Sequence, residues 1–228
     1  MKDFFMIENE TISIPRDKGI YTPAEDTYLL LHLITAFLDS GTSSSIPSEA
    51  TALDMGCGNG LITYHLSQRF TRVHAIDVNP HCLVHLGTMS RKLPSLSRVT
   101  CISMDLFSGF KTSGKTPEYH VACFNPPYLP FNGNKTFHEN SRVNASRGNE
   151  NMIDKALYSN EGGGETLRMF LESIPMYLAP GGHVFFVKSS LTTFDEFDAF
   201  LACNGYTQVS MKSVHMFFED ICAYHVKR

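Results

Sequence analysis

The strongest indication of the fold is the stretch Thr51-Ala-Leu-Asp-Met-Gly-Cys-Gly-Asn-Gly60. Its first five residues form an apolar run typical of a buried strand, and glycines follow at alternate positions. Glycine adopts backbone conformations that side chains disfavour, so this turn brings the main chain close to a ligand. Residues 61–70 then have the apolar spacing of a helix. A strand, a glycine turn and a helix in this order predict an α/β domain.

The alternation of strands and helices continues after this stretch. Strands are expected over 72–77, 99–104, 119–124 and 183–187, and helices over 80–91, 165–178 and 193–203. Two final strands, over about 206–212 and 216–225, are too closely connected to be parallel. We therefore predict an α/β fold with a doubly wound, mostly parallel sheet and an antiparallel last strand.

The remaining segments are interpreted as parts of one domain that spans 1–228. Residues 1–19 are expected to form a short, partly ordered leader, and 20–38 an N-terminal helix. In that helix Thr22 would be the cap and Pro23 the first helical residue. Residues 130–163 are polar and rich in asparagine, and they are interpreted as a long loop on the substrate side.

Composition narrows the class of protein. The 228 residues are 43% hydrophobic and 18% charged, which is typical of a soluble globular protein, and the net charge of −4 argues against a broad nucleic-acid-binding face. The six cysteines contain no C-x-x-C pair, so we expect free thiols and no metal site. Neither a signal peptide nor an apolar run of about 20 residues is recognisable, which predicts no membrane association. We expect the protein in the cytoplasm, with a nuclear pool as an alternative.

Acidic residues stand at the ends of three successive predicted strands: Asp54, Asp77 and Asp105. Their charges disfavour a pyrophosphate or triphosphate, but they suit ribose hydroxyls, an adenine amine and a cationic amino acid group. S-adenosyl-L-methionine carries all of these groups. The glycine turn alone is weaker support, because its spacing fits the dinucleotide fingerprint imperfectly and an ordinary strand-to-helix connection would also explain it.

The sequence Asn125-Pro126-Pro127-Tyr128 follows the apolar run 119–124. Two prolines end a strand, and they do so at the carboxyl edge where open α/β sheets bind their ligands. The Asn125 side chain and the Pro126 carbonyl offer acceptors, and Tyr128 offers a flat face, which together suit a planar NH₂ group. Taken alone, the same four residues would indicate only an Asn-Pro turn.

Together these motifs resemble class I S-adenosylmethionine-dependent methyltransferases, whose fold is a Rossmann-like sheet of seven strands. The Asn-Pro-Pro-Tyr motif, preceded by Tyr21-Thr-Pro-Ala-Glu-Asp-Thr27, is similar to the eukaryotic and archaeal branch of release-factor glutamine methyltransferases, called HemK2/Mtq2-like. The resemblance covers roughly 20–130 and 160–228. Thr22 stands where these relatives usually have glutamate, and the segment 131–160 is longer than theirs.

The resemblance implies methyl transfer to the side-chain amide of a glutamine in the Gly-Gly-Gln motif of a class I release factor, free or bound to its GTPase partner. It implies catalytic roles for Asn125, Pro126, Pro127 and Tyr128. The residues that it implies for cofactor binding are Tyr21, Pro23, Thr27, Asp54, Gly56, Gly58, Gly60, Asp77, Asp105, Leu106 and Asn125. It also implies that the helix over 20–38 closes the cofactor site, and that a small zinc-binding activator of the Trm112 type adds to the third strand at about 98–104.

Other activities use the same chemistry and stay open at this point. The Asn-Pro-Pro-Tyr corner would suit the N6 amine of adenine in DNA, although the net charge makes a nucleic-acid substrate an unfavoured alternative. Methylation of a protein lysine is a further alternative, and a non-enzymatic cofactor-binding scaffold is a third. No residue is predicted to be a dedicated general base, because the amide proton can leave as the new bond forms.

Overall fold

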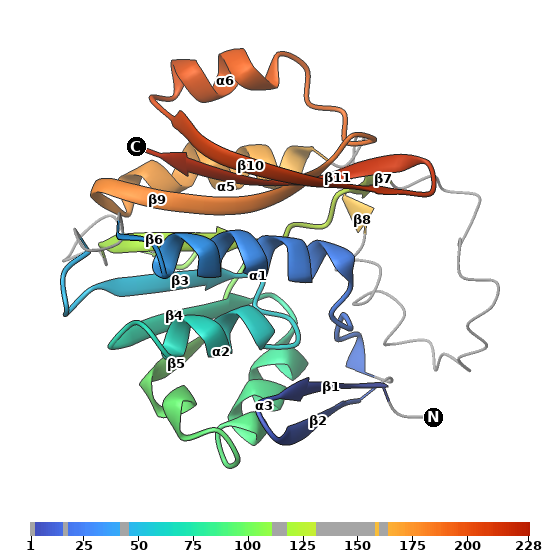
Figure 1. Ribbon diagram of the computed structural model, residues 1–228, viewed down its shortest axis with the longest axis vertical. Coiled ribbons are helices and arrows are strands. Elements are labelled where there is room, and N and C mark those ends of the chain that lie inside the picture. Colours follow the sequence, from blue (N-terminus) through green and yellow to red (C-terminus); the bar gives the residue numbers. More distant parts are fainter. Residues whose placement is uncertain (1–2, 16–17, 42–45, 111–117, 131–157, 160–163) are drawn as a thin grey trace.

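The centre of the molecule is a seven-stranded sheet (Figure 1). The computed structural model describes residues 3–15, 18–41, 46–110, 118–130, 158–159 and 164–228. In their order across the sheet, the strands are β10 (Thr207–Met216), β11 (Glu219–Lys227), β9 (Leu178–Ser189), β6 (Tyr119–Phe124), β3 (Thr51–Met55), β4 (Arg72–Asp77) and β5 (Val99–Ser103). The strands from β9 to β5 pair in parallel, whereas β11 is antiparallel to both its neighbours. The predicted doubly wound sheet with its antiparallel last strand is confirmed.

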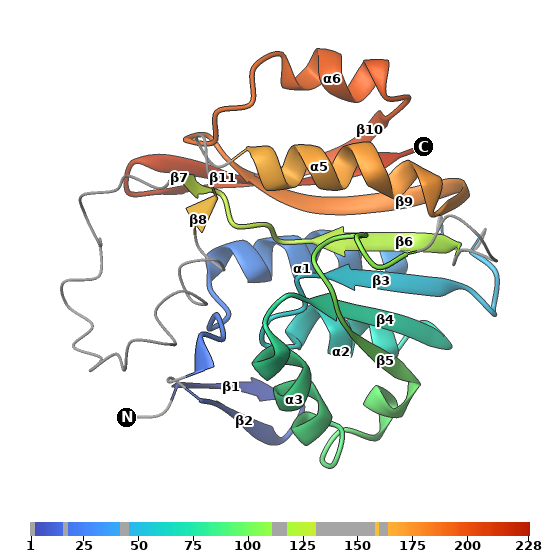
Figure 2. The ribbon, with the colours of Figure 1, turned by 180° about the vertical axis from the view of Figure 1, so that it is seen from behind.

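Helices cover both faces of the sheet. One face carries α1 (Glu25–Leu38), α2 (Leu61–Ser67) and α3 (Pro80–Met89), and the other carries α5 (Glu165–Ser173) and α6 (Phe197–Cys203). Figure 1 shows α1 and α2 in front of the sheet, and Figure 2 shows α5 in front of it. Two short 3₁₀ helices, η3 (Pro94–Arg98) and η5 (Ile174–Met176), lead into β5 and β9. None of the helices in the described ranges is long and apolar enough to cross a bilayer.

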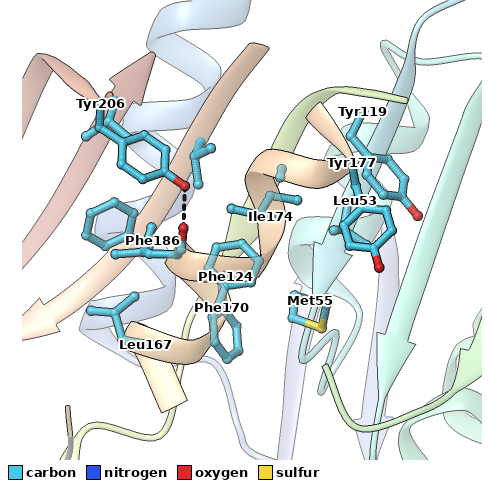
Figure 3. Close-up of a cluster of buried hydrophobic side chains, with 14 of the residues drawn as sticks. Leu53, Met55, Tyr119, Phe124, Leu167, Phe170, Ile174, Tyr177, Phe186 and Tyr206 are labelled. Atoms are coloured by element: carbon cyan, nitrogen blue, oxygen red, sulfur yellow. Dashed lines mark hydrogen bonds between the residues drawn. The ribbon is translucent and has the colours of Figure 1, made fainter. Parts of the chain in front are cut away.

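Aromatic side chains form the core beneath α5 (Figure 3). The rings of Phe124 and Phe170 lie 4.8 Å apart, and Phe107 stacks on Tyr177 at 4.7 Å. The buried Tyr206 hydroxyl donates a hydrogen bond of 2.7 Å to the Leu171 carbonyl oxygen, which satisfies its polar end. Because Phe124 is the last residue of β6, this packing fixes the strand end from which the Asn-Pro-Pro-Tyr corner begins.

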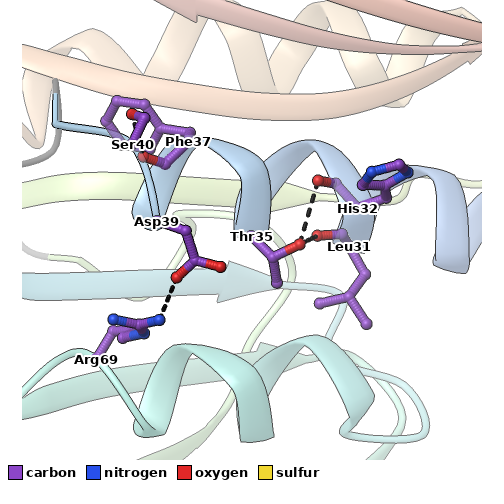
Figure 4. A network of polar contacts seen from close by, with 7 residues as sticks. All are labelled: Leu31, His32, Thr35, Phe37, Asp39, Ser40 and Arg69. Atoms are coloured by element: carbon purple, nitrogen blue, oxygen red, sulfur yellow. Dashed lines mark hydrogen bonds and ion pairs between the residues drawn. The ribbon is translucent and has the colours of Figure 1, made fainter.

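The opposite core is organised by α1, whose apolar face lies against β9 and β11. Figure 4 shows the polar contacts at its end, where Thr35 Oγ1 donates to the Leu31 carbonyl at 3.0 Å and Ser40 Oγ donates to that of Phe37 at 2.6 Å. An ion pair between Asp39 and Arg69 joins the end of α1 to the chain just after α2. The polar contacts finish the end of the helix, and the apolar packing against β9 and β11 holds α1 across the sheet.

The N-terminal residues differ from the predicted leader. They form a hairpin of β1 (Asp3–Ile7) and β2 (Glu10–Ile14) rather than a partly ordered segment. Alternate side chains of both strands are buried, and they pack against α2 and α3. This alternation is the ordinary signal of a half-buried strand and is visible in the sequence.

The start of the N-terminal helix also differs from the prediction. It begins at Glu25 after an extended Ala24, so Pro23 lies outside the helix and Thr22 does not cap it. The reason is tertiary: side chains from the sheet edge hold the preceding residues 18–21 in place. Most of the predicted loop over 130–163 lies outside the described residues. Only β7 (Leu129–Pro130) and β8 (Tyr158–Ser159) are described there, as a parallel pair.

Candidate active site

A cavity of about 870 Å³ opens at the carboxyl ends of β3, β4 and β6, beside the first turn of α1. The sheet places it there because parallel strands end at a common edge. Of the residues predicted to form the site, the following line the cavity: Tyr21, Pro23, Thr27, Asp54, Gly56, Gly58, Asp77, Asp105, Leu106, Asn125, Pro126, Pro127 and Tyr128. The structure therefore brings together every predicted site residue except Gly60.

Gly60 has a packing role instead. It has a left-handed φ of 83°, and a Cβ atom there would lie 2.8 Å from Leu86 Cδ1 of α3. Its place as the residue before α2 requires glycine for close helix packing. The assignment of Gly60 to cofactor contact is thus not supported by its position, because it does not line the cavity.

The glycine turn and the end of β4 are joined by one carboxylate. Asp77 Oδ2 accepts a hydrogen bond of 2.9 Å from the Gly58 amide, and its Oδ1 accepts one of 2.8 Å from the Asn79 amide. Both Gly56 and Gly58 have left-handed φ values, which give the turn its tight path. Burial raises the pKa of Asp77, and the two amide bonds oppose that effect. The Asp77 carboxylate thus lines the cavity in a fixed orientation.

Asp54 lies deeper at the end of β3 and is fully buried. It accepts a hydrogen bond from the Thr63 hydroxyl of α2. Burial, with a smaller contribution from the nearby Asp77 charge, raises the pKa of Asp54 to about 7 against the opposing effect of the Thr63 hydrogen bond. A buried carboxylate with this pKa gains from a cationic neighbour, because the cation stabilises the ionised form.

The charge of the cavity is one-sided. Its lining carboxylates are Asp26, Asp54, Asp77, Asp105, Glu165 and Glu219. None of the described lining residues is lysine, arginine or histidine. Such a lining repels phosphates and favours a ligand that carries positive charge and hydroxyl groups. In addition, no group of histidine, cysteine or acidic residues within the described ranges is arranged to hold a metal ion.

The Asn125 side chain has a defined orientation. Its Nδ2 donates a hydrogen bond of 3.0 Å to Asp26 Oδ2, which assigns the carboxamide and leaves Oδ1 on the other side. Oδ1 is buried and has no hydrogen-bond partner among the described residues. A buried acceptor without a partner is costly in a folded protein, and it is a mark of a site that receives a donor from a ligand.

Asp26 is the centre of the polar network at this end of the cavity. Its side chain is 4% exposed. It accepts hydrogen bonds from the hydroxyls of Tyr21 at 3.2 Å and Tyr128 at 3.1 Å, and from the Thr27 amide at 2.6 Å. Burial, followed by the Asp26 charge, raises the pKa of both tyrosines far above the usual range, so they are neutral donors. Asp26 was not predicted as a site residue, because an acidic residue in a first helical turn is common.

Two asparagines missed by the sequence analysis build the wall in front of α1. Asn59 Nδ2 donates to the Tyr21 carbonyl at 2.9 Å, and Asn79 Nδ2 donates to the Lys18 and Gly19 carbonyls at 2.9 and 3.0 Å. Their Oδ1 atoms accept from the Leu61 and His81 amides at the starts of α2 and α3. The only sequence signal was their place beside a helix start, which is typical of capping.

The known proteins that resemble this chain in sequence and fold include several methyltransferases. No protein-family model matches the chain. A protein of Methanocaldococcus jannaschii, provisionally named a protein N5-glutamine methyltransferase, is 28% identical over 188 residues, which cover 82% of this chain and 81% of that protein. The structure of the E. cuniculi Mtq2-Trm112 complex, which methylates the translation termination factor eRF1, matches with a TM-score of 0.59 at 20% identity, over 92% of this chain and 99% of that chain.

A third similarity is to the N-methyltransferase NodS of Bradyrhizobium japonicum, solved with S-adenosyl-L-homocysteine. It has a TM-score of 0.56 at 16% identity and covers 90% of this chain and 88% of that chain. These similarities show the class I methyltransferase fold, for which S-adenosyl-L-methionine is the expected cofactor. In sequence and fold the chain resembles the HemK2/Mtq2-like branch of that class, as the motifs predicted.

The residues of the cavity fit that cofactor. The acidic lining suits its sulfonium and ammonium charges, and Asp77 is placed to accept from ribose hydroxyls at the end of β4. Leu106, with a left-handed φ of 45°, lies beside Asp105 at the end of the next strand and would frame the adenine. Asp54 and Thr27 line the part between the glycine turn and α1, where the amino acid group would lie.

Proposed function

We propose that the chain methylates the side-chain amide nitrogen of a glutamine in the Gly-Gly-Gln motif of a class I release factor. The observation that carries this proposal is the Asn125 carboxamide, whose Nδ2 is bonded to Asp26 while its buried Oδ1 has no partner in the described part of the chain. The provisional name of the M. jannaschii relative supports a protein glutamine as the acceptor, and the E. cuniculi complex, which methylates eRF1, supports a release factor as the protein that carries it.

A planar NH₂ group has two hydrogens, and the corner supplies two acceptors for them. Asn125 Oδ1 would take one hydrogen and the Pro126 carbonyl the other, with the Tyr128 ring against the amide plane. An amide nitrogen is a poor nucleophile because its lone pair is delocalised into the carbonyl. Two strong acceptors increase the electron density on nitrogen and fix its direction, so the corner works mainly by positioning.

When bound, the cofactor supplies a methyl group on a sulfonium, which loses its positive charge on transfer. The chain's residues prepare for this step by keeping the dipoles of the corner fixed. Phe124 lines the cavity beside the corner, and Asp26 holds Asn125, Tyr128 and Tyr21 in one arrangement before the substrate arrives. Such preorganised groups need no rearrangement during the reaction.

The edge of the sheet offers a place for an activator subunit of the Trm112 type. β5 is an edge strand, and no other strand in the described ranges pairs with its outer side. The side chains of Thr100, Cys101 and Ser103 are exposed along it. An exposed edge is a template for strand addition, so we propose this strand as the activator contact. As a separate proposal, we place the action of the protein in the cytoplasm.

The proposal is tested by incubating the chain, with and without a Trm112-type subunit, with labelled cofactor and candidate substrates. We expect label on release factor but not on a release factor whose Gly-Gly-Gln glutamine is replaced by alanine. Duplex DNA and a lysine-rich protein such as a histone are the competing substrates. Label on either one, and none on release factor, would overturn the proposal.

A further inference from the structure

The turn between β10 and β11 carries two exposed phenylalanines. Met216 pairs with Glu219, so Phe217 and Phe218 are the whole connection of the hairpin. Their side chains are 87% and 91% exposed, more than any other large apolar side chain in the described ranges. Exposed aromatic rings of this kind weaken solubility, and they are uncommon unless a partner covers them.

The backbone at this turn is also unfavourable for the residue that occupies it. Phe217 has a φ of 50°, in the left-handed region where two-residue hairpin turns usually carry glycine or asparagine. A bulky residue there is strained, and the exposed ring gains little packing in return. The fold therefore does not explain why phenylalanine stands at this position, and unexplained strain of this kind gathers at functional sites.

The turn lies beside the active-site cavity. Glu219, the residue after Phe218, lines the cavity and accepts a hydrogen bond from Ser189 Oγ at the end of β9. The next residue, Asp220, donates from its amide to Ser190 Oγ at 2.9 Å and accepts from the Ser190 amide at 2.8 Å. These contacts fix the base of the turn to the same sheet edge that holds the Asn-Pro-Pro-Tyr corner.

We propose that Phe217 and Phe218, called here the aromatic tip, are a docking site for the protein substrate, next to the cavity that receives its glutamine. This inference rests on the proposed function. The occupant is a protein with an apolar spot flanked by basic groups, since Glu219 and Asp220 follow the tip directly and the adjoining cavity is lined by carboxylates without a lysine, arginine or histidine among its described residues. Asp220 also pairs with His215 at the base of the turn, so Glu219 and the cavity carboxylates supply the free negative charge. The same acidic surroundings repel nucleic acid and anionic membranes.

The test compares two substrates and two variants of the full chain, prepared with the activator subunit. The tip variant combines Phe217→Gly with Phe218→Ser, and glycine relieves the strained φ so that folding is preserved. The matched control is Phe4→Ser, which removes a 62% exposed phenylalanine from β1, outside the cavity lining. The substrates are intact release factor and a short Gly-Gly-Gln peptide that reaches only the cavity.

For the tip variant we expect KM for intact release factor to rise at least about 10-fold, as for loss of an aromatic anchor, with kcat unchanged. KM for the peptide and the affinity for S-adenosyl-L-homocysteine should stay at wild-type values, and the control should behave as wild type. Unchanged KM for release factor in an active tip variant overturns the docking site alone. If the wild type is a dimer, and the tip variant is a monomer whose KM for release factor is unchanged, then the tip serves self-association. That result also overturns the docking site. Absence of any transfer by the wild type overturns the proposed function and this inference with it.

Discussion

The proposed cofactor end and the proposed substrate end of the cavity are built in different ways. At the cofactor end, Asp77 bonds backbone amides of the glycine turn and of its own strand end, so the site follows from short local stretches. At the substrate end, Asp26 of α1 bonds Asn125 and Tyr128, which lie 99 and 102 residues further along the chain. The cofactor end therefore depends on backbone geometry. The substrate end depends on one side chain, that of Asp26, which the tertiary fold places beside the corner. Substitutions at the two ends should therefore separate cofactor binding from methyl transfer.

The largest effect is expected for Asn125→Ala at the substrate end. Loss of the Oδ1 acceptor should lower the single-turnover rate of methyl transfer by about 100-fold or more, similar to the loss of one oxyanion-hole donor. Binding of S-adenosyl-L-homocysteine, measured by calorimetry, should stay close to that of the wild type. A variant that transfers at the wild-type rate would remove Asn125 from the mechanism.

Asp77→Asn should produce the opposite result at the cofactor end. The side-chain carboxamide of this variant cannot accept hydrogen bonds from both backbone N–H groups, of Gly58 and Asn79, as strongly as the Asp77 carboxylate does. The ribose also loses its charged acceptor. We expect the affinity for S-adenosyl-L-homocysteine to fall about 10- to 100-fold, as for one hydrogen bond to a charged group. The transfer rate at saturating cofactor should change much less. If affinity is unchanged while the rate falls, the division between the two ends is wrong.

The pH dependence of stability offers a third test of the cofactor end. Because burial raises the pKa of Asp54 from 3.8 to about 7, the folded state binds a proton more tightly than the unfolded chain. This group therefore stabilises the fold below pH 4, and its contribution is lost as pH rises from about 4 to 7. Between pH 5 and 7.5 the unfolding free energy of the cofactor-free wild type, measured in urea, should fall by about 2 kcal/mol more than that of Asp54→Asn over the same range. Equal pH profiles for both proteins would contradict this pKa.

Two glycines of one turn give the smallest effects. Gly60→Ala would strain a φ of 83° and place Cβ 2.8 Å from Leu86, so the unfolding free energy should fall by about 2 kcal/mol. Gly58→Ala is also strained, at a φ of 49°, but its nearest neighbour would be 3.7 Å away, which predicts a loss of about 1 kcal/mol. Only Gly58→Ala should weaken cofactor binding in the folded protein, since Gly58 lines the cavity and Gly60 does not. The reverse pattern would restore Gly60 to the cofactor site.

The sequence predicted the sheet and most of the cofactor end because their signals are local. Apolar runs, glycines and strand-terminal aspartates lie within a few residues of each other at 51–60 and 72–77. Long-range contacts decided the rest. The start of α1 at Glu25 follows from Asn59 and Asn79, which hold the preceding residues extended. The role of Asp26 was hidden because nothing near it in sequence shows that Asn125 lies beside it. Gly60 shows the converse case, in which a residue inside a ligand-binding motif serves helix packing.

Asp26→Asn is the most direct test of the central claim, that Asp26 orients Asn125 so that Oδ1 faces the substrate amide. An amide at position 26 no longer requires the Asn125 NH₂ group to face it, so Asn125 can rotate and present a donor to the substrate. The matched control, Tyr128→Phe, removes one hydrogen bond to Asp26 but keeps the flat ring and the bond to Asn125. In single-turnover assays with saturating cofactor, Asp26→Asn should transfer about 10- to 100-fold more slowly, with unchanged affinity for S-adenosyl-L-homocysteine, and Tyr128→Phe should lose much less of the rate because the bond between Asp26 and Asn125 remains. A wild-type rate in Asp26→Asn would contradict the account.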